Sequence, residues 1–255
     1  MTLVGGCVGV LSGGLGIGGG ILMVPAFIEF ASLDPHTAKG TSLFVILPVA
    51  ALNAWRLNHD RKDIQWRLAG QLAIGALVGG YAGGWVTRYL DGSTVLWLFI
   101  GLLGLVGFRT LFLEDPRGTV SQVRNRPALA VLIGFLSAIA GSATGTGGGI
   151  VMVPLALLAA LTSNDRVVGL SNIIMVVTSA AGTAAHLGAE RISAMPGTAG
   201  QVNLALAFFV FLGAQVSSRW GVQLNAFLTL RRRRIIMGAL LIIVASRLAY
   251  RALSI

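Results

Sequence analysis

The sequence predicts an all-α, polytopic membrane protein made of two inverted repeats, each with a glycine-broken, re-entrant first segment. The first observation behind this prediction is composition. Of the 255 residues, 55% are apolar and only 11% are charged. A soluble domain carries roughly 25% charged residues, so this chain has too few to cover a water-facing surface. The other two observations are the spacing of the apolar stretches and an internal duplication.

Apolar stretches of about the 20 residues needed to cross a bilayer recur along the whole chain. Most of the 19 Lys and Arg residues lie between these stretches, as is typical of loops held on the cytoplasmic side. We therefore interpret the net charge of +10 as a membrane-topology signal and expect no nucleic-acid partner. No Lys or Arg precedes Lys39, so we expect no cleaved signal peptide. The stretches cover residues 3–31, 38–56, 68–90, 94–113, 128–161, 165–187, 199–218 and 235–255.

A glycine-rich decapeptide occurs twice. Residues 16–25 (GIGGGILMVP) match residues 145–154 (GTGGGIVMVP) with eight identities in ten positions, at an offset of 129 residues. At the same offset, residues 40–42 (GTS) fall on residues 169–171 (GLS). We therefore expect an N-terminal membrane repeat over 1–125 and a C-terminal one over 126–255, which together form one transmembrane domain.

The distribution of basic residues favours an inverted arrangement of these halves. If all four stretches of each half cross the membrane, the repeats are parallel, and 11 of the 19 Lys and Arg lie on one side against 8 on the other. If the first stretch of each half is a re-entrant hairpin, six crossings remain and the balance becomes 14 against 5. The second arrangement fits the positive-inside rule better and places both termini outside.

The two glycine breaks are the main candidate site. Each glycine costs about 1 kcal/mol relative to alanine inside a helix, and unpaired backbone at membrane depth must be shielded by protein or line a wet cavity. Where helix resumes after a break, free N–H groups and a positive dipole end can bind an anion. Tight helix packing is the alternative interpretation. The predicted binding glycines are Gly18, Gly19, Gly20, Gly147, Gly148 and Gly149.

Hydroxyl and amide side chains near the breaks could hydrogen-bond the same anion. They are Thr41, Ser42, Thr146, Ser171 and Asn172, and back-bonding to their own helix is the alternative role. We expect Lys39 to snorkel to the membrane interface. The remaining candidates are proton carriers or loop residues at one membrane face, namely Glu29, Asp34, His36 and His186.

Other glycines and motifs receive simpler interpretations. Gly75, Gly79, Gly80, Gly83 and Gly84 form overlapping small-residue steps, for which we expect packing or dimerisation. Residues 14–19 satisfy the dinucleotide pattern G-x-G-x-x-G, but they lack the strand that this motif requires. We find no metal-binding, ATP-binding or catalytic arrangement, and we expect neither enzymatic activity nor a cofactor.

The doubled pattern G-x-G-G-G-x-x-x-x-P, followed by residues 38–42 (AKGTS), resembles the sulfite exporter TauE/SafE family over essentially the whole chain. The resemblance implies a multi-pass permease of the cell inner membrane for small sulfur-containing or carboxylate anions, among them sulfite, sulfoacetate and related organosulfonates. Family members are usually regarded as secondary transporters and exporters. The second copy departs from the pattern, because Leu170 stands where the first has Thr41.

The leading expectation is therefore a secondary anion transporter, most simply an exporter, that binds its substrate between the two breaks near the midplane. Its partners would be a small anion and the lipid bilayer, with a homodimer as an open alternative. A channel-like anion pore is the runner-up within transport. A membrane partner that assembles another complex without transporting is the alternative from a different class.

Overall fold

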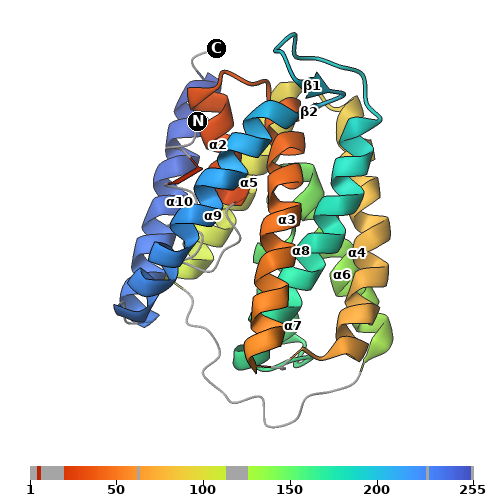
Figure 1. The fold of residues 1–255 in the computed structure, drawn as a ribbon, viewed down its shortest axis with the longest axis vertical. Helices are drawn as coiled ribbons and strands as arrows, with labels where there is room; N and C mark the ends of the chain where they lie inside the picture. Colours follow the sequence, from red (N-terminus) through yellow and green to blue (C-terminus); the bar gives the residue numbers. More distant parts are fainter. Residues whose placement is uncertain (1–4, 7–19, 62–63, 113–125, 228–229, 254–255) are drawn as a thin grey trace.

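The computed structural model describes residues 5–6, 20–61, 64–112, 126–227 and 230–253. Almost all of them are helical, and a short antiparallel hairpin, β1 (Thr198–Ala199) with β2 (Val202–Asn203), is the sheet found in these ranges. The all-α prediction is confirmed. The helices, shown in Figure 1, are α2 (Gly20–Phe30), α3 (Pro35–Arg61), α4 (Trp66–Val86), η1 (Thr87–Tyr89), α5 (Gly92–Phe112), α6 (Pro127–Thr144), α7 (Gly149–Leu158), α8 (Asn164–Leu187), α9 (Leu204–Phe227) and α10 (Leu230–Leu253).

Several of these helices are suited to cross a membrane. Within the described ranges, four are long and apolar enough to do so, at Pro35–Arg56, Gly92–Phe112, Pro127–Thr144 and Arg166–Leu187. By contrast, α2 has 11 residues and α7 has 10. At about 1.5 Å per residue each is roughly half as long as the ~30 Å hydrocarbon core is thick. The structure therefore confirms a polytopic membrane protein and shows that α7, which described residues bound at both ends, is too short to span.

The helices α6 and α7 form a hairpin. A Cβ atom placed on Gly148, just before α7, would lie 2.7 Å from the carbonyl oxygen of Ser137 in α6. The chain therefore turns back along the helix it has just left. In Figure 1 the start of α6 and the end of α7 both lie toward the bottom of the view. This is the geometry that a re-entrant segment requires.

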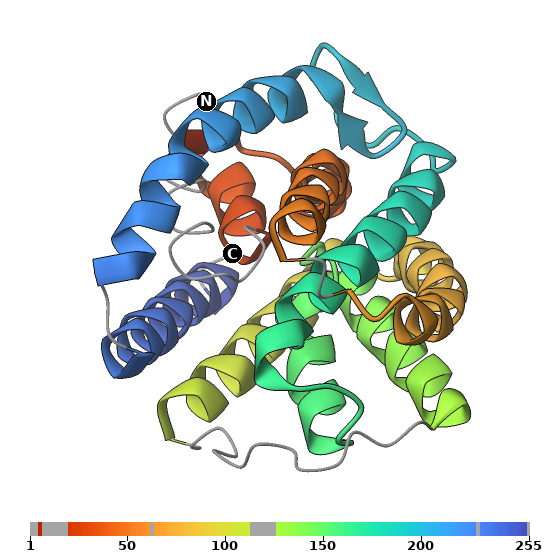
Figure 2. The same cartoon turned by 60° about the horizontal axis from the view of Figure 1, so that its bottom comes forward.

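Helix α4 packs between α6 and α8, and its glycines allow both contacts (Figure 2). A Cβ atom on Gly83 would lie 2.6 Å from the carbonyl oxygen of Ile139 in α6, and Gly75 and Gly79 meet the same helix. Gly80 and Gly84 instead face α8. The packing interpretation of these five glycines is confirmed. Because these five glycines already contact α6 or α8 of the same chain, they do not offer a dimer surface.

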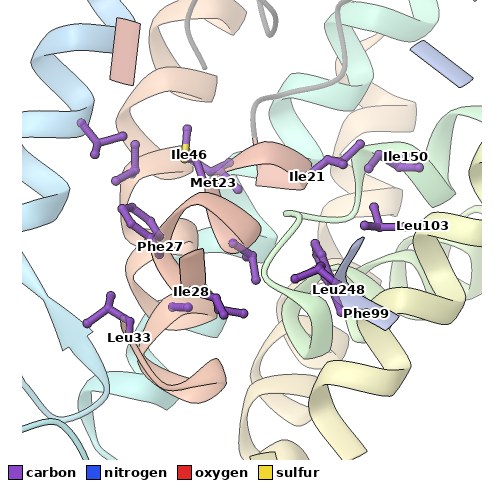
Figure 3. Close-up of a cluster of buried hydrophobic side chains, with 14 of the residues drawn as sticks. Ile21, Met23, Phe27, Ile28, Leu33, Ile46, Phe99, Leu103, Ile150 and Leu248 are labelled. Carbon is purple, nitrogen blue, oxygen red and sulfur yellow. The ribbon is translucent and has the colours of Figure 1, made fainter. Parts of the chain in front are cut away.

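The buried apolar side chains form two clusters. One joins α2, α3, α5, α9 and α10 and also includes Ile150 of α7 and Met175 of α8, and Figure 3 shows part of it, with Phe27, Phe99 and Leu248 among the labelled side chains. The other joins α4, α6, α7 and α8 around side chains such as Met152. Large apolar side chains are also exposed around the outside, as expected of a surface that faces lipid. The glycine break before α7 lies where helices of both clusters meet.

Several close contacts recur at matching positions of the two halves. A Cβ atom on Gly20 would lie 2.6 Å from Cδ1 of Ile46, and one on Gly149 would lie 2.7 Å from Sδ of Met175. Both members of the second pair are 129 positions after their counterparts. The repeat boundaries and the inverted orientation themselves stay predictions.

Candidate functional site

The break between α6 and α7 is built by three glycines with positive φ. Gly145, Gly147 and Gly148 have φ values of 76°, 79° and 82°, a region that favours glycine. The N–H groups of Thr146 and Gly147 donate to the carbonyl oxygen of Gly141, at 2.9 and 3.2 Å, which closes the end of α6. Helix α7 begins at Gly149, and its N-cap residue Gly148 makes no side-chain cap hydrogen bond. The positive end of α7 is therefore presented at a turn that side chains from other helices surround.

The end of the first break meets this turn directly. Gly20 is the first residue of α2. A Cβ atom there would lie 2.9 Å from Cα of Thr146 and 3.0 Å from the carbonyl oxygen of Gly145. Of the other predicted glycines of the first break, Gly18 and Gly19 lie outside the described residues. The N-terminus of α2 and the second break thus share one location, as the site prediction requires.

Two serines, one in α3 and one in α8, flank the second break. Ser42 of α3 donates a 2.8 Å hydrogen bond from Oγ to the carbonyl oxygen of Gly145. Ser171 of α8 has its Oγ 2.7 Å from the position that a Cβ atom on Gly149 would take. The hydroxyl of Thr146 lies within the turn, 3.0 Å from that of Thr144. Ser42, Thr146, Ser171 and the turn glycines therefore gather at one place.

Thr41 and Asn172 use their polar groups for backbone contacts. Oγ1 of Thr41 accepts a 2.9 Å hydrogen bond from the backbone N–H of Asn203, next to the start of α9. Nδ2 of Asn172 donates to the carbonyl oxygen of Val168 at 2.9 Å, which is the back-bonding alternative. Thr41 therefore fixes the segment that precedes α9, and the Asn172 amide nitrogen is occupied by its own helix.

Lys39 is placed differently from the expectation. Its side chain is only 1% exposed, and Nζ has no hydrogen-bond partner within the part of the chain that the structure describes. A Cβ atom on Gly145 would lie 2.7 Å from Cβ of Lys39, so the lysine borders the second break. The snorkelling prediction is wrong. The face of α3 that carries Lys39 is covered by α8, by the turn before α7 and by the residues that precede α9.

The two candidate histidines are helical and buried, so the loop interpretation is also wrong. His186 in α8 is 0% exposed, and its Nδ1 lies 2.8 Å from Oε1 of Gln201. His36 in α3 is 7% exposed. Glu29 differs, because it forms a 3.2 Å ion pair with Arg247, whose side chain is largely exposed. Sequence reasoning missed Gln201, which lies in a segment between α8 and α9 that is longer than the corresponding α3–α4 connection.

A further group of buried hydroxyls escaped sequence reasoning. Within the described ranges their oxygen atoms have no hydrogen-bond partner, although native proteins pair most buried polar groups with protein, water or an ion. Oγ of Ser179 lies 3.3 Å from the Cβ position of Gly147. The turn is therefore bordered by Lys39 and by the hydroxyl of Ser179, which is unpartnered within the described residues, and this combination is suited to an oxyanion. These hydroxyls belong to Ser137, Ser142, Thr178, Ser179 and Thr183.

An apolar groove of about 820 Å³ lies between α4, α5 and α6. It has no charged residue in its lining, and its two hydroxyls are already bonded. Thr87 donates to the carbonyl oxygens of Gly83 and Gly84, and Thr144 donates to that of Ala140. The groove therefore suits an acyl chain and provides no path for an anion.

Several helices can span a membrane, and they enclose buried polar groups beside a break in the helical backbone. These features define a multi-pass membrane protein with a candidate site inside the bundle. The chain belongs to the sulfite exporter TauE/SafE family, whose pattern matches residues 1–248. It is 27% identical to a probable membrane transporter protein of Methanocaldococcus jannaschii, over 94% of this chain and 91% of that protein. It is 25% identical to the probable membrane transporter protein YunE of Bacillus subtilis, over 98% of this chain and 95% of that protein. No solved structure matches the chain. The family and these relatives support the class of membrane transporter.

Proposed function

We propose that the chain is a secondary transporter that exports small sulfur-containing or carboxylate anions, such as sulfite, sulfoacetate or related organosulfonates, across the cell inner membrane. The observation that carries this proposal is the buried, unpartnered Nζ of Lys39 beside the second break. A buried ammonium group that makes no hydrogen bond is unfavourable, and Asp34, the carboxylate that acts on Lys39 electrostatically, is not hydrogen-bonded to it. An anion that enters the site supplies hydrogen-bond acceptors and further negative charge.

The anion is held from several directions in this proposal. Lys39 in its ammonium form supplies positive charge, and the N-terminus of α7 supplies roughly half a charge. Ser171 and Thr146 supply hydroxyl hydrogen bonds, while Ser42 holds the turn in place. No carboxylate is hydrogen-bonded to Lys39 among the described residues, which leaves its ammonium group available to substrate.

Alternating access follows if the chain is built as two inverted repeats that rock against one another around this site. Three observations support this arrangement. The α6–α7 segment is a hairpin, the Gly20 and Gly149 contacts recur at matching positions, and the basic residues divide 14 against 5 in the inverted topology. The contact of Gly20 with the second break then lies on the interface between repeats.

Flux in proteoliposomes tests the proposal. We expect purified protein to take up labelled sulfite or sulfoacetate saturably, and to exchange internal for external anion. The matched control is Gly148→Leu, which places a side chain where even a Cβ atom would be 2.7 Å from the Ser137 carbonyl oxygen. Conductive flux that does not saturate would indicate a channel-like pore. Absence of flux for both anions, in folded protein, would indicate a partner or assembly role.

A further inference from the structure

We propose that His186 is a proton-loading site, and that the proton it takes up is cotransported with the anion. This inference rests on the proposed transport function and adds a coupling ion to it. Ionisable side chains inside membrane helices are expensive to keep and commonly serve proton relays. His186 lies in the spanning segment Arg166–Leu187 and is fully buried.

The hydrogen bonds of His186 leave one ring nitrogen available. Nδ1 lies 2.8 Å from Oε1 of Gln201, and the backbone N–H of Gln201 donates to the carbonyl oxygen of His186 at 3.0 Å. Because an amide oxygen only accepts, Nδ1 carries the ring proton and Nε2 is the basic nitrogen. In the described part of the chain Nε2 has no partner. A proton from water can therefore add to Nε2 without breaking a hydrogen bond.

The charges around His186 make proton uptake depend on the anion. Lys39 and His36 of α3 act on it electrostatically, and so does Arg88 of η1. Asp34, just before α3, acts on Lys39 and His36. A third cation beside Lys39 and Arg88 is unfavourable while the site is empty. An anion beside Lys39 offsets this repulsion, so binding of the anion and of the proton favour one another by the same factor.

The segment that holds Gln201 also covers this end of the site. The carbonyl oxygen of Gln201 lies against Gly40, where there is no room for a Cβ atom. Two residues further on, the N–H of Asn203 donates to Oγ1 of Thr41. The segment thus touches α3 at Gly40 and Thr41, beside its contact with His186. Movement of this segment would uncover the histidine and the lysine together, which places proton and anion entry at the same end of the molecule.

Proton uptake on anion binding tests the inference. Purified protein in weakly buffered detergent solution near neutral pH is mixed with sulfoacetate or thiosulfate, neither of which titrates there, while a pH indicator is followed. We expect wild-type protein to take up protons when the anion binds, up to one per anion, because reciprocal linkage makes each binding event favour the other. His186→Gln should lose this uptake. The matched control His59→Gln, an exposed histidine stacked on Trp55, should keep it.

A transport assay separates the two proposals. In proteoliposomes, His186→Gln should keep measurable anion exchange but lose accumulation driven by a pH gradient. Accumulation that persists in His186→Gln would overturn the proton-loading role and leave the transport function standing. If His186→Gln does not fold, His186→Asn takes its place in both assays. Anion binding without proton uptake overturns the inference alone, and failure to bind either anion overturns both proposals.

Discussion

Oγ of Ser42 donates a 2.8 Å hydrogen bond to the carbonyl oxygen of Gly145, across 103 positions of sequence. This bond joins α3 to the turn that follows α6. The acceptor belongs to Gly145, the positive-φ glycine that directly follows α6. Carbonyl groups at the end of a helix have no partner within the helix, and the Ser42 hydroxyl supplies one here. The shape of the break is therefore set partly from the other half of the chain.

Ser42→Ala should destabilise the protein and weaken anion binding. A lost intramolecular hydrogen bond costs about 1 kcal/mol, and an unsatisfied buried carbonyl raises that figure toward about 3 kcal/mol. The thermal midpoint in detergent and the affinity for sulfoacetate measure the two effects. Ser246→Ala on the exposed face of α10 is the control and should change neither. Equal behaviour of the two variants would show that the Ser42 bond has no role in the site.

Gly20→Ala should reduce transport at least tenfold, equivalent to about 1.4 kcal/mol, while the protein still inserts. Its added Cβ atom would be 2.9 Å from Cα of Thr146, so the two breaks would have to move apart. The control is Gly104→Ala in α5, where a Cβ atom meets nothing within 4 Å. That change should stabilise the helix by about 1 kcal/mol without loss of transport. Full transport by Gly20→Ala would show that close contact of the breaks is not required.

The sequence predicted which residues meet at the second break wherever the repeat carried the information. The duplicated glycines led to the second break, and the repeat equivalence of Ser42 and Ser171 led to two of its flanking hydroxyls. Lys39 could not be placed in this way, because its burial depends on α8 and on residues 188–203. Gln201 lies in that longer segment, so no repeat pattern marks it. Ser142 and Ser179 look like ordinary small residues of packed helices, and three-dimensional contact is needed to bring them to the break.

Labelling of introduced cysteines should reveal the inverted topology. In a Cys7→Ala background, single cysteines at positions 61, 125 and 232 should react with an impermeant reagent from the cytoplasmic side. A cysteine at the exposed position of Arg191 should react from the opposite side. We expect this because the inverted topology places 14 of the 19 Lys and Arg on the cytoplasmic side and 5 on the other side. Labelling of position 232 from outside, with 61 and 125 inside, would instead support parallel repeats.

Equilibrium binding of sulfoacetate to Lys39→Met and Lys39→Arg, in protein shown to be folded, tests most directly whether the anion binds beside Lys39. Methionine is close to lysine in length but neutral, so it removes the charge that the buried site needs. Loss of one partner of a buried charge pair costs about 2 kcal/mol or more, which corresponds to an affinity at least about 30-fold weaker. Arginine should retain part of the affinity. An affinity for Lys39→Met within a few-fold of wild type would contradict an anion site centred on Lys39 and the second break.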